Sequence, residues 1–92
     1  MRETHIEAHL EKKARLAGWL VFKVVFPGRR GAPDRVLFGT DSRLVWVELK
    51  TLVGRESVTQ LKMHERLRAR GQEVVVLNSI EAVDAWLAVN VP

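Results

Sequence analysis

The sequence predicts an α/β fold of a single domain, residues 1–92, in which a mixed sheet is flanked by helices in the order αβββαβα. Four short segments are rich in β-branched and aromatic residues, a composition typical of strands. Three other segments repeat apolar residues at helical spacing. The segment 43–50 carries apolar residues on both of its sides, which indicates a strand covered by helices on both faces.

The N-terminal part begins with a helix predicted over residues 4–17, after which Gly18 ends the apolar spacing. The apolar residues on one face of this helix are Ile6, Leu10, Ala14 and Ala17. Residues 19–26 are the first predicted strand, which Pro27 and Gly28 break. A loop containing two arginines follows, so the chain is expected to leave the sheet through a basic loop.

The next two predicted strands, 35–39 and 43–50, form a hairpin because only the short turn 40–42 separates them. If this turn centres on Asp41, the numbers of paired residues sum to 82. The expected pairs are then Asp34 with Glu48, Val36 with Trp46 and Phe38 with Leu44. Two carboxylates therefore lie opposite each other at the end of the hairpin.

The C-terminal part contains a helix that Ser57 opens and Gly71 ends, a strand over residues 74–77, and a short final helix. The final helix is predicted from apolar residues at Ile80, Val83, Trp86 and Leu87. Three tryptophans fall in apolar patterns and are expected in the core rather than as base-stacking platforms: Trp19, Trp46 and Trp86. The histidines His5, His9 and His64 lie on helices and are expected to be surface or packing residues.

Composition limits the possible functions. The chain has no cysteine, which excludes disulfides, thiol catalysis and zinc-finger sites. It lacks the pattern of a signal peptide and any long apolar run, so we expect a soluble, cytoplasmic protein without a membrane partner. The core of 92 residues is thin, which favours a metal or a partner subunit as additional support. The net charge of +4 is expected of a protein with a nucleic-acid partner, but charge alone fits a merely basic soluble protein equally well.

The opposed carboxylates of Asp34 and Glu48 are the main candidate for chemistry. Like charges directly opposite each other destabilise a sheet, and a divalent cation would offset their repulsion. Lys50 lies two residues beyond Glu48 and projects from the same face of the strand. A cation beside an ammonium group can support phosphodiester hydrolysis. The alternative is structural: Asp34 belongs to a turn after Pro33, and Glu48 forms a surface ion pair with Lys50.

Several motifs together resemble a known family. Gly31-Ala32-Pro33-Asp34, followed after the hairpin by Glu48-Leu49-Lys50, resembles the PD-(D/E)xK nuclease superfamily and its restriction-endonuclease-like αβββαβ core. Within the superfamily the chain is most similar to the VRR-Nuc domain of virus-type replication and repair nucleases, from Glu3 to about Gly71. Supporting segments are Glu3–Glu7, Phe26–Gly31 and Ser57–Gln60.

The resemblance implies a set of roles at the site. Asp34, Glu48 and the backbone carbonyl of Leu49 would ligate Mg²⁺, for which Mn²⁺ would substitute, and Lys50 would position or activate the attacking water. Gln60 would point toward the site from the second helix. Either Glu3 or Glu7 would complete the site from the first helix. Capping boxes are the alternative roles for Glu7, with Thr4, and for Gln60, with Ser57.

The basic residues near the site indicate a substrate, and the resemblance adds an assembly. The residues expected to bind backbone phosphates are Arg29, Arg30, Arg35 and Lys62. Because no base-reading motif is evident, we expect recognition of branched DNA, such as a four-way junction or a flap. Small stand-alone VRR-Nuc proteins resemble Holliday junction resolvases that act as homodimers, and a phage or prophage origin fits this family. A DNA-binding module with the same fold but no catalysis is the competing hypothesis.

Overall fold

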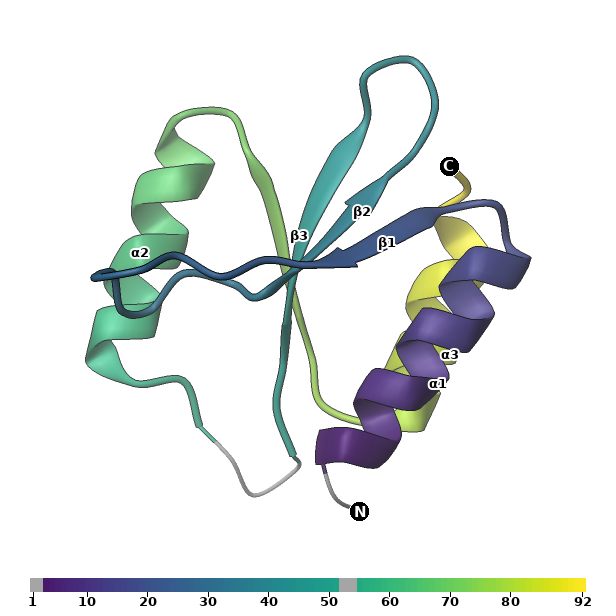
Figure 1. The fold of residues 1–92 in the computed structure, drawn as a ribbon, viewed down its shortest axis with the longest axis horizontal. Helices are drawn as coiled ribbons and strands as arrows, with labels where there is room; N and C mark the ends of the chain where they lie inside the picture. The colour runs from purple at the N-terminus through teal and green to yellow at the C-terminus, as the bar shows by residue number, and fades with distance from the viewer. Residues whose placement is uncertain (1–2, 52–54) are drawn as a thin grey trace.

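The computed structural model describes residues 3–51 and 55–92 and confirms the predicted order of elements (Figure 1). The elements are α1 (Glu3–Leu16), β1 (Leu20–Lys23), β2 (Arg35–Phe38), β3 (Leu44–Leu49), α2 (Val58–Ala69), β4 (Glu73–Leu77) and α3 (Ile80–Val89). The first strand is shorter than predicted, because its pairing with β2 ends at Lys23. No helix in this described part is long and apolar enough to span a membrane.

The four strands form one mixed sheet in the order β1-β2-β3-β4. The first three strands are antiparallel neighbours, whereas β3 and β4 are parallel and α2 connects them. The predicted hairpin register is confirmed, since Val36 pairs with Trp46 and Phe38 pairs with Leu44. The last bridge joins Arg35 to Val47, so the chain positions just beyond it belong to Asp34 and Glu48.

One face of the sheet carries the main core. Helices α1 and α3 lie side by side against it (Figure 1). Their buried residues contact odd-numbered residues of β3, because side chains alternate between the two faces of a strand. This cluster includes Ile6, Leu10, Ala14, Val45, Val47, Leu49 and Val83. The rings of Trp19 and Trp86 lie 5.6 Å apart beside it, so both tryptophans belong to the core as expected.

The opposite face of the sheet is only partly covered by α2. Among the described residues of α2, only His64 is buried, and the helix contacts the sheet mainly at β4. The face therefore keeps exposed hydrophobic residues on β1 and β2, where Leu20, Phe22 and Phe38 are 61%, 52% and 39% exposed. Trp46 lies on this face and is only half-buried, so its predicted burial in the core is wrong. The reason is that even-numbered residues of β3 face away from α1 and α3.

Candidate active site

The fold brings Asp34, Glu48 and Lys50 to one end of the sheet. The carbonyl of Asp34 accepts a hydrogen bond from the backbone N–H of Val24 at 2.8 Å, which ties the start of β2 to the end of β1. Lys50 donates its backbone N–H to the carbonyl of Leu77 at 3.0 Å, which extends the β3–β4 pairing by one residue. Both backbone segments are thereby held by the sheet, and the Lys50 ammonium lies 3.8 Å from the Glu48 carboxylate.

Glu48 has an unusual electrostatic environment. It is only 6% exposed. Burial is the largest cause that raises the pKa of its carboxyl group from 4.5 to about 7, and the Lys50 ammonium opposes this change. Three neighbouring carboxylates raise the pKa further: Asp34, Glu3 and Glu56. Negative charge therefore accumulates around a buried carboxylate with one nearby ammonium, an arrangement that favours binding of a cation.

The available donors fit Mg²⁺ better than a metal that needs a complete protein cage. Within residues 3–51 and 55–92, no three His, Cys, Asp or Glu side chains lie close enough to hold a metal ion. Asp34 and Glu48 offer carboxylate oxygens, and Mg²⁺ prefers such oxygens while keeping several of its waters. Leu49 buries its side chain in the core on the other face, so only its backbone could contribute.

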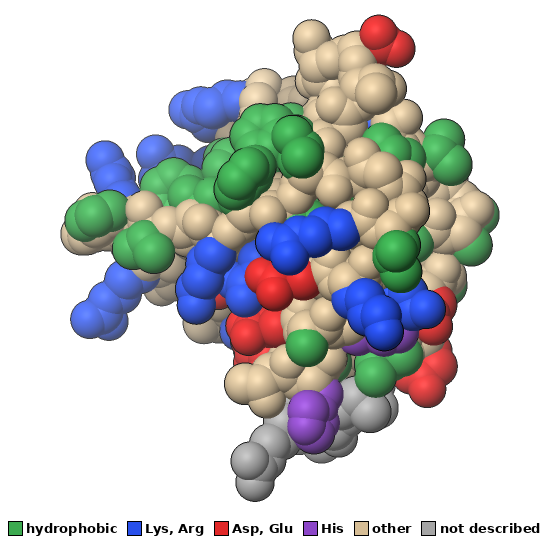
Figure 2. All heavy atoms as spheres, turned by 45° about the vertical axis from the view of Figure 1, so that its right-hand side comes forward, with side chains coloured by type: hydrophobic (Ala, Val, Ile, Leu, Met, Phe, Trp, Pro, Cys, Tyr) green, Lys and Arg blue, Asp and Glu red, His purple; other side chains and the backbone are tan. Residues whose placement is uncertain are grey.

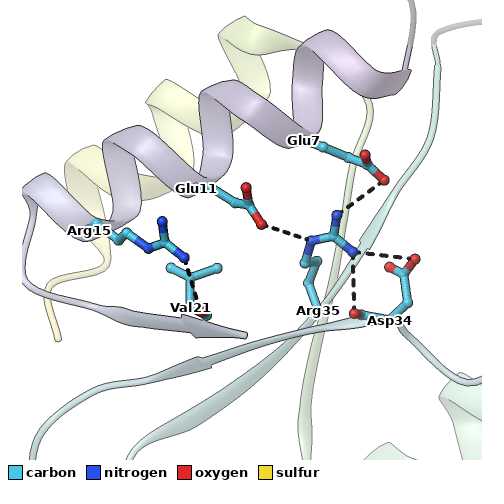
Figure 3. Close-up of polar contacts among 6 residues, drawn as sticks. All are labelled: Glu7, Glu11, Arg15, Val21, Asp34 and Arg35. Atoms are coloured by element: carbon cyan, nitrogen blue, oxygen red, sulfur yellow. Dashed lines mark hydrogen bonds and ion pairs between the residues drawn. The ribbon is translucent and has the colours of Figure 1, made fainter. Parts of the chain in front are cut away.

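The two candidate glutamates of α1 have different surroundings. The Glu7 carboxylate lies 3.3 Å from the Arg35 guanidinium (Figure 3). Glu3 instead acts on the pKa of Glu48. The structure therefore associates Glu7 with a buried arginine and Glu3 with the buried glutamate of the site.

Arg35 does not occupy the exposed position that binding to phosphate requires. Its side chain is 4% exposed, and its guanidinium lies 3.5 Å from Asp34 and 3.6 Å from Glu11 as well as beside Glu7 (Figure 3). The expected role of Arg35 in clamping DNA is therefore wrong. The reason is strand alternation, which turns Arg35 toward α1 while its neighbours in sequence face the other way. In this position Arg35 links the start of β2 to α1.

Gln60 lies in the first turn of α2 and takes part in its cap. The Ser57 hydroxyl accepts a hydrogen bond from the Gln60 N–H at 3.1 Å, and the Gln60 side-chain oxygen accepts one from the Ser57 N–H at 2.9 Å. This complete capping box stabilises the helix start. It uses only the oxygen of the Gln60 side chain, so the amide NH₂ group takes no part in the cap.

Sequence reasoning missed one acidic residue near the site. Glu56 lies 2.6 Å from the ring of the fully buried His64, and its charge also raises the pKa of Glu48. Glu56 precedes α2, whereas His64 lies within it, so no periodic spacing within one element signals their contact. His64 agrees with the expected packing role, and the pair fastens the segment before α2 to the helix.

Three of the predicted phosphate-binding residues lie together on one side of α2. Arg29, Arg30 and Lys62 line a hollow of about 340 Å³, which we call the basic hollow, and Arg66 joins them. Gly31 holds the arginine loop against the helix. A Cβ atom at this glycine would lie 2.7 Å from the carbonyl oxygen of Thr59, and its φ of +83° is one that L-residues rarely adopt.

Comparison with known proteins supports a single family. No protein-family model matches the sequence. The chain is 39% identical over 90 residues to the protein named "Putative nuclease p44" of Acyrthosiphon pisum secondary endosymbiont phage 1, an alignment that covers 98% of this chain and 97% of that protein. A solved structure described as a VRR_NUC domain matches with a TM-score of 0.87 and 31% identity over 95% of both chains. The chain therefore belongs to the VRR_NUC family of nucleases.

Proposed function

We propose that residues 1–92 act as one Mg²⁺-dependent endodeoxyribonuclease domain that cleaves branched DNA, in the manner of a Holliday junction resolvase. The observation that carries this proposal is the buried Glu48, which is surrounded by the charges of Asp34, Glu3 and Glu56 and has Lys50 beside it. A protein that only bound phosphate would gain nothing from acidic groups that repel it. A cation-dependent hydrolase needs these groups.

Asp34, Glu48 and the carbonyl of Leu49 would hold the metal ion. When bound, Mg²⁺ or Mn²⁺ would stabilise negative charge on the phosphate and favour ionisation of water. The Lys50 ammonium would orient the attacking water and stabilise charge that develops on the phosphate oxygens. The amide NH₂ of Gln60, which its cap leaves unused, would donate to the phosphate.

We propose Glu3 rather than Glu7 as the glutamate that completes the site from α1. The charge of Glu3 acts on Glu48, whereas Glu7 neutralises the buried Arg35. Glu7 would then support the site indirectly, because Arg35 also contacts Asp34. The discriminating measurement is nuclease activity: Glu3→Gln should lower kcat with the fold intact, whereas Glu7→Gln should mainly lower stability. The reverse pattern would assign the site to Glu7.

The basic hollow supports recognition of the DNA backbone. Arg29, Arg30 and Lys62 are exposed, and no ion pair within the described part of the chain neutralises them. Such side chains bind phosphates without reading bases. The protein would then select DNA by shape, which suits branched substrates.

We also propose that the active form is a homodimer. The exposed hydrophobic residues Leu20, Phe22 and Phe38 lie on neighbouring strands, and β1 is an edge strand of the sheet. Figure 2 shows hydrophobic side chains grouped on the surface beside Lys and Arg side chains. A two-fold dimer would bury such a patch and match the symmetry of a four-way junction. A monomer measured by light scattering at micromolar concentration would contradict this assembly.

The test of the proposal is cleavage of end-labelled four-way junction, flap and duplex DNA with magnesium, with manganese and with chelator. Asp34→Asn and Lys50→Ala should abolish metal-dependent cleavage while retaining binding to the junction. A matched control is Lys13→Ala, an exposed lysine on α1 that should leave cleavage unchanged. If wild type binds the junction but cuts no substrate in either metal, the protein is a DNA-binding module. The relative from a phage supports a phage or prophage origin.

A further inference from the structure

A second hollow, separate from the carboxylates, lies between α2, β3 and the loop before β2. Its volume is about 340 Å³, and most of its lining is apolar, from Phe26, Trp46, Met63 and Leu67. We call it the aromatic hollow. The rings of Phe26 and Trp46 lie 5.8 Å apart at an angle of 50°, so they form two inclined walls. The Trp46 ring is held in place because its Nε1–H donates to the Gln72 side-chain oxygen at 3.3 Å.

The aromatic hollow adjoins the candidate active site. Trp46 lies two residues before Glu48 on the same face of β3, which separates their Cα atoms by ~7 Å. Pro33 also lines the hollow and directly precedes Asp34. A nucleotide whose phosphate lay between Asp34 and Glu48 would therefore have an aromatic hollow within reach of its base.

The rim of the aromatic hollow is cationic. Arg29, Arg66 and Arg70 line it, and in the described part of the chain none of them forms an ion pair with a carboxylate. Apolar walls beneath unneutralised guanidinium groups match a base with its attached phosphates, since bases stack on aromatic rings and arginines bind phosphate oxygens. A second copy of this chain is better accommodated by the uncharged patch of Leu20, Phe22 and Phe38 than by this rim, which three arginines line.

We propose that the aromatic hollow binds one unpaired base of the DNA, next to the phosphate that is cleaved. This inference rests on the proposed nuclease function and narrows its substrate to DNA with an unpaired nucleotide at the cleavage point. A base within a continuous duplex is stacked and paired, so it cannot enter the hollow without an energetic cost for its extrusion. Flaps, gaps and open branch points offer an unpaired base without that cost.

The test compares binding of two fluorescent DNAs in chelator: a duplex with a single-stranded flap and the same duplex fully paired. Phe26→Ala removes one wall at a loop residue that is 38% exposed, so the fold should be retained. We expect this variant to bind the flap about tenfold more weakly, which is ~1.4 kcal/mol, and to bind the paired duplex as wild type does. The matched control is Leu16→Ala, which should change neither affinity. Leu16 is an exposed residue at the end of α1, and α1 lies on the opposite side of the sheet from α2 (Figure 1).

A fluorescent base analogue placed at the flap junction provides a second readout that does not depend on affinity. Stacking in the aromatic hollow should quench its fluorescence with wild type and not with Phe26→Ala at saturating protein. An equal loss of binding on both DNAs, no loss on the flap, or unchanged quenching would each overturn the inference.

Cleavage by wild type in magnesium separates this inference from the proposed function. If wild type cuts the flap but Phe26→Ala shows no flap-specific loss of binding, the proposed base site is wrong and the proposed nuclease function stands. If the loss of binding by Phe26→Ala is flap-specific but wild type cuts no DNA in magnesium or manganese, the proposed nuclease function is wrong and the proposed base site stands.

Discussion

Replacing Glu48 with glutamine changes the charge at the most buried carboxylate of the site while nearly preserving its shape. In the metal-free protein, burial first and neighbouring carboxylates second raise the pKa of Glu48 from 4.5 to about 7. The folded protein therefore holds this proton more tightly than the unfolded chain does. Below pH 4.5 both states are protonated and ionisation has no cost. As the pH rises from 4.5 to about 7, Glu48 ionises more readily in the unfolded chain than in the folded protein, so the free energy of unfolding progressively falls.

The size of this effect follows from the pKa change. At 1.36 kcal/mol per pKa unit, a rise from 4.5 to about 7 corresponds to ~3 kcal/mol of destabilisation that is fully developed above about pH 7. Solvent screens little of it, because Glu48 is almost inaccessible. Glutamine cannot ionise, so Glu48→Gln should unfold at a higher urea concentration than wild type at neutral and alkaline pH. The two proteins should have nearly equal stability near pH 4.5.

The assay is urea denaturation of both proteins in chelator between about pH 5 and about pH 8. The control is Glu65→Gln, an exposed glutamate of α2, which should show no such pH-dependent gain. Magnesium should then stabilise wild type more than Glu48→Gln, because only wild type keeps both carboxylates. A stability difference between the two proteins that stays constant with pH would refute the electrostatic reasoning. So would a variant less stable than wild type at about pH 8.

Three further outcomes are expected. Arg35→Ala should lower the free energy of unfolding by ~3 kcal/mol, because it leaves three nearby carboxylates without their buried cation, and an unchanged urea midpoint would contradict this. Gly31→Ala should reduce stability and DNA binding together, since its Cβ would meet the Thr59 carbonyl at 2.7 Å; wild-type values in denaturation and anisotropy would refute the close contact. Arg30→Ala and Lys62→Ala should each reduce the slope of log K against log salt by ~1 in DNA-binding titrations, and an unchanged slope would remove that residue from the phosphate contacts.

The hairpin register is the clearest case in which local sequence predicted structure. A short turn joins two strands that alternate side chains, so one assumed turn centre determines every pair. The pairs Val36–Trp46 and Phe38–Leu44 confirm it. The sequence also predicted helices on both faces of the sheet, because a strand with apolar residues on both sides needs to be covered on both faces. The first strand was overestimated because residues 24–26 are apolar but lie beyond the bridges with β2.

The surroundings of individual side chains were less accessible to sequence reasoning. Arg35 follows Asp34 directly and looked like part of a basic loop, yet it is buried against two glutamates of α1. Trp46 looked like a core residue, yet it forms a wall of the aromatic hollow because α2 covers only part of that face. Strand alternation decides which face each side chain takes. Whether that face is covered depends on how far each helix extends over the sheet, which spacing within one element does not report.

The sequence alone predicts the fold class, the order of elements, the hairpin register and the family resemblance of this protein. All four follow from short-range periodicity and from motifs a few residues long. The folded chain was needed to place Glu7 beside Arg35, to bring the charges of Glu3 and Glu56 to bear on Glu48, and to bury Arg35. These contacts join residues far apart in the chain, and burial changes the strength of their charges. Such proximity and burial arise only when the helices pack against the sheet.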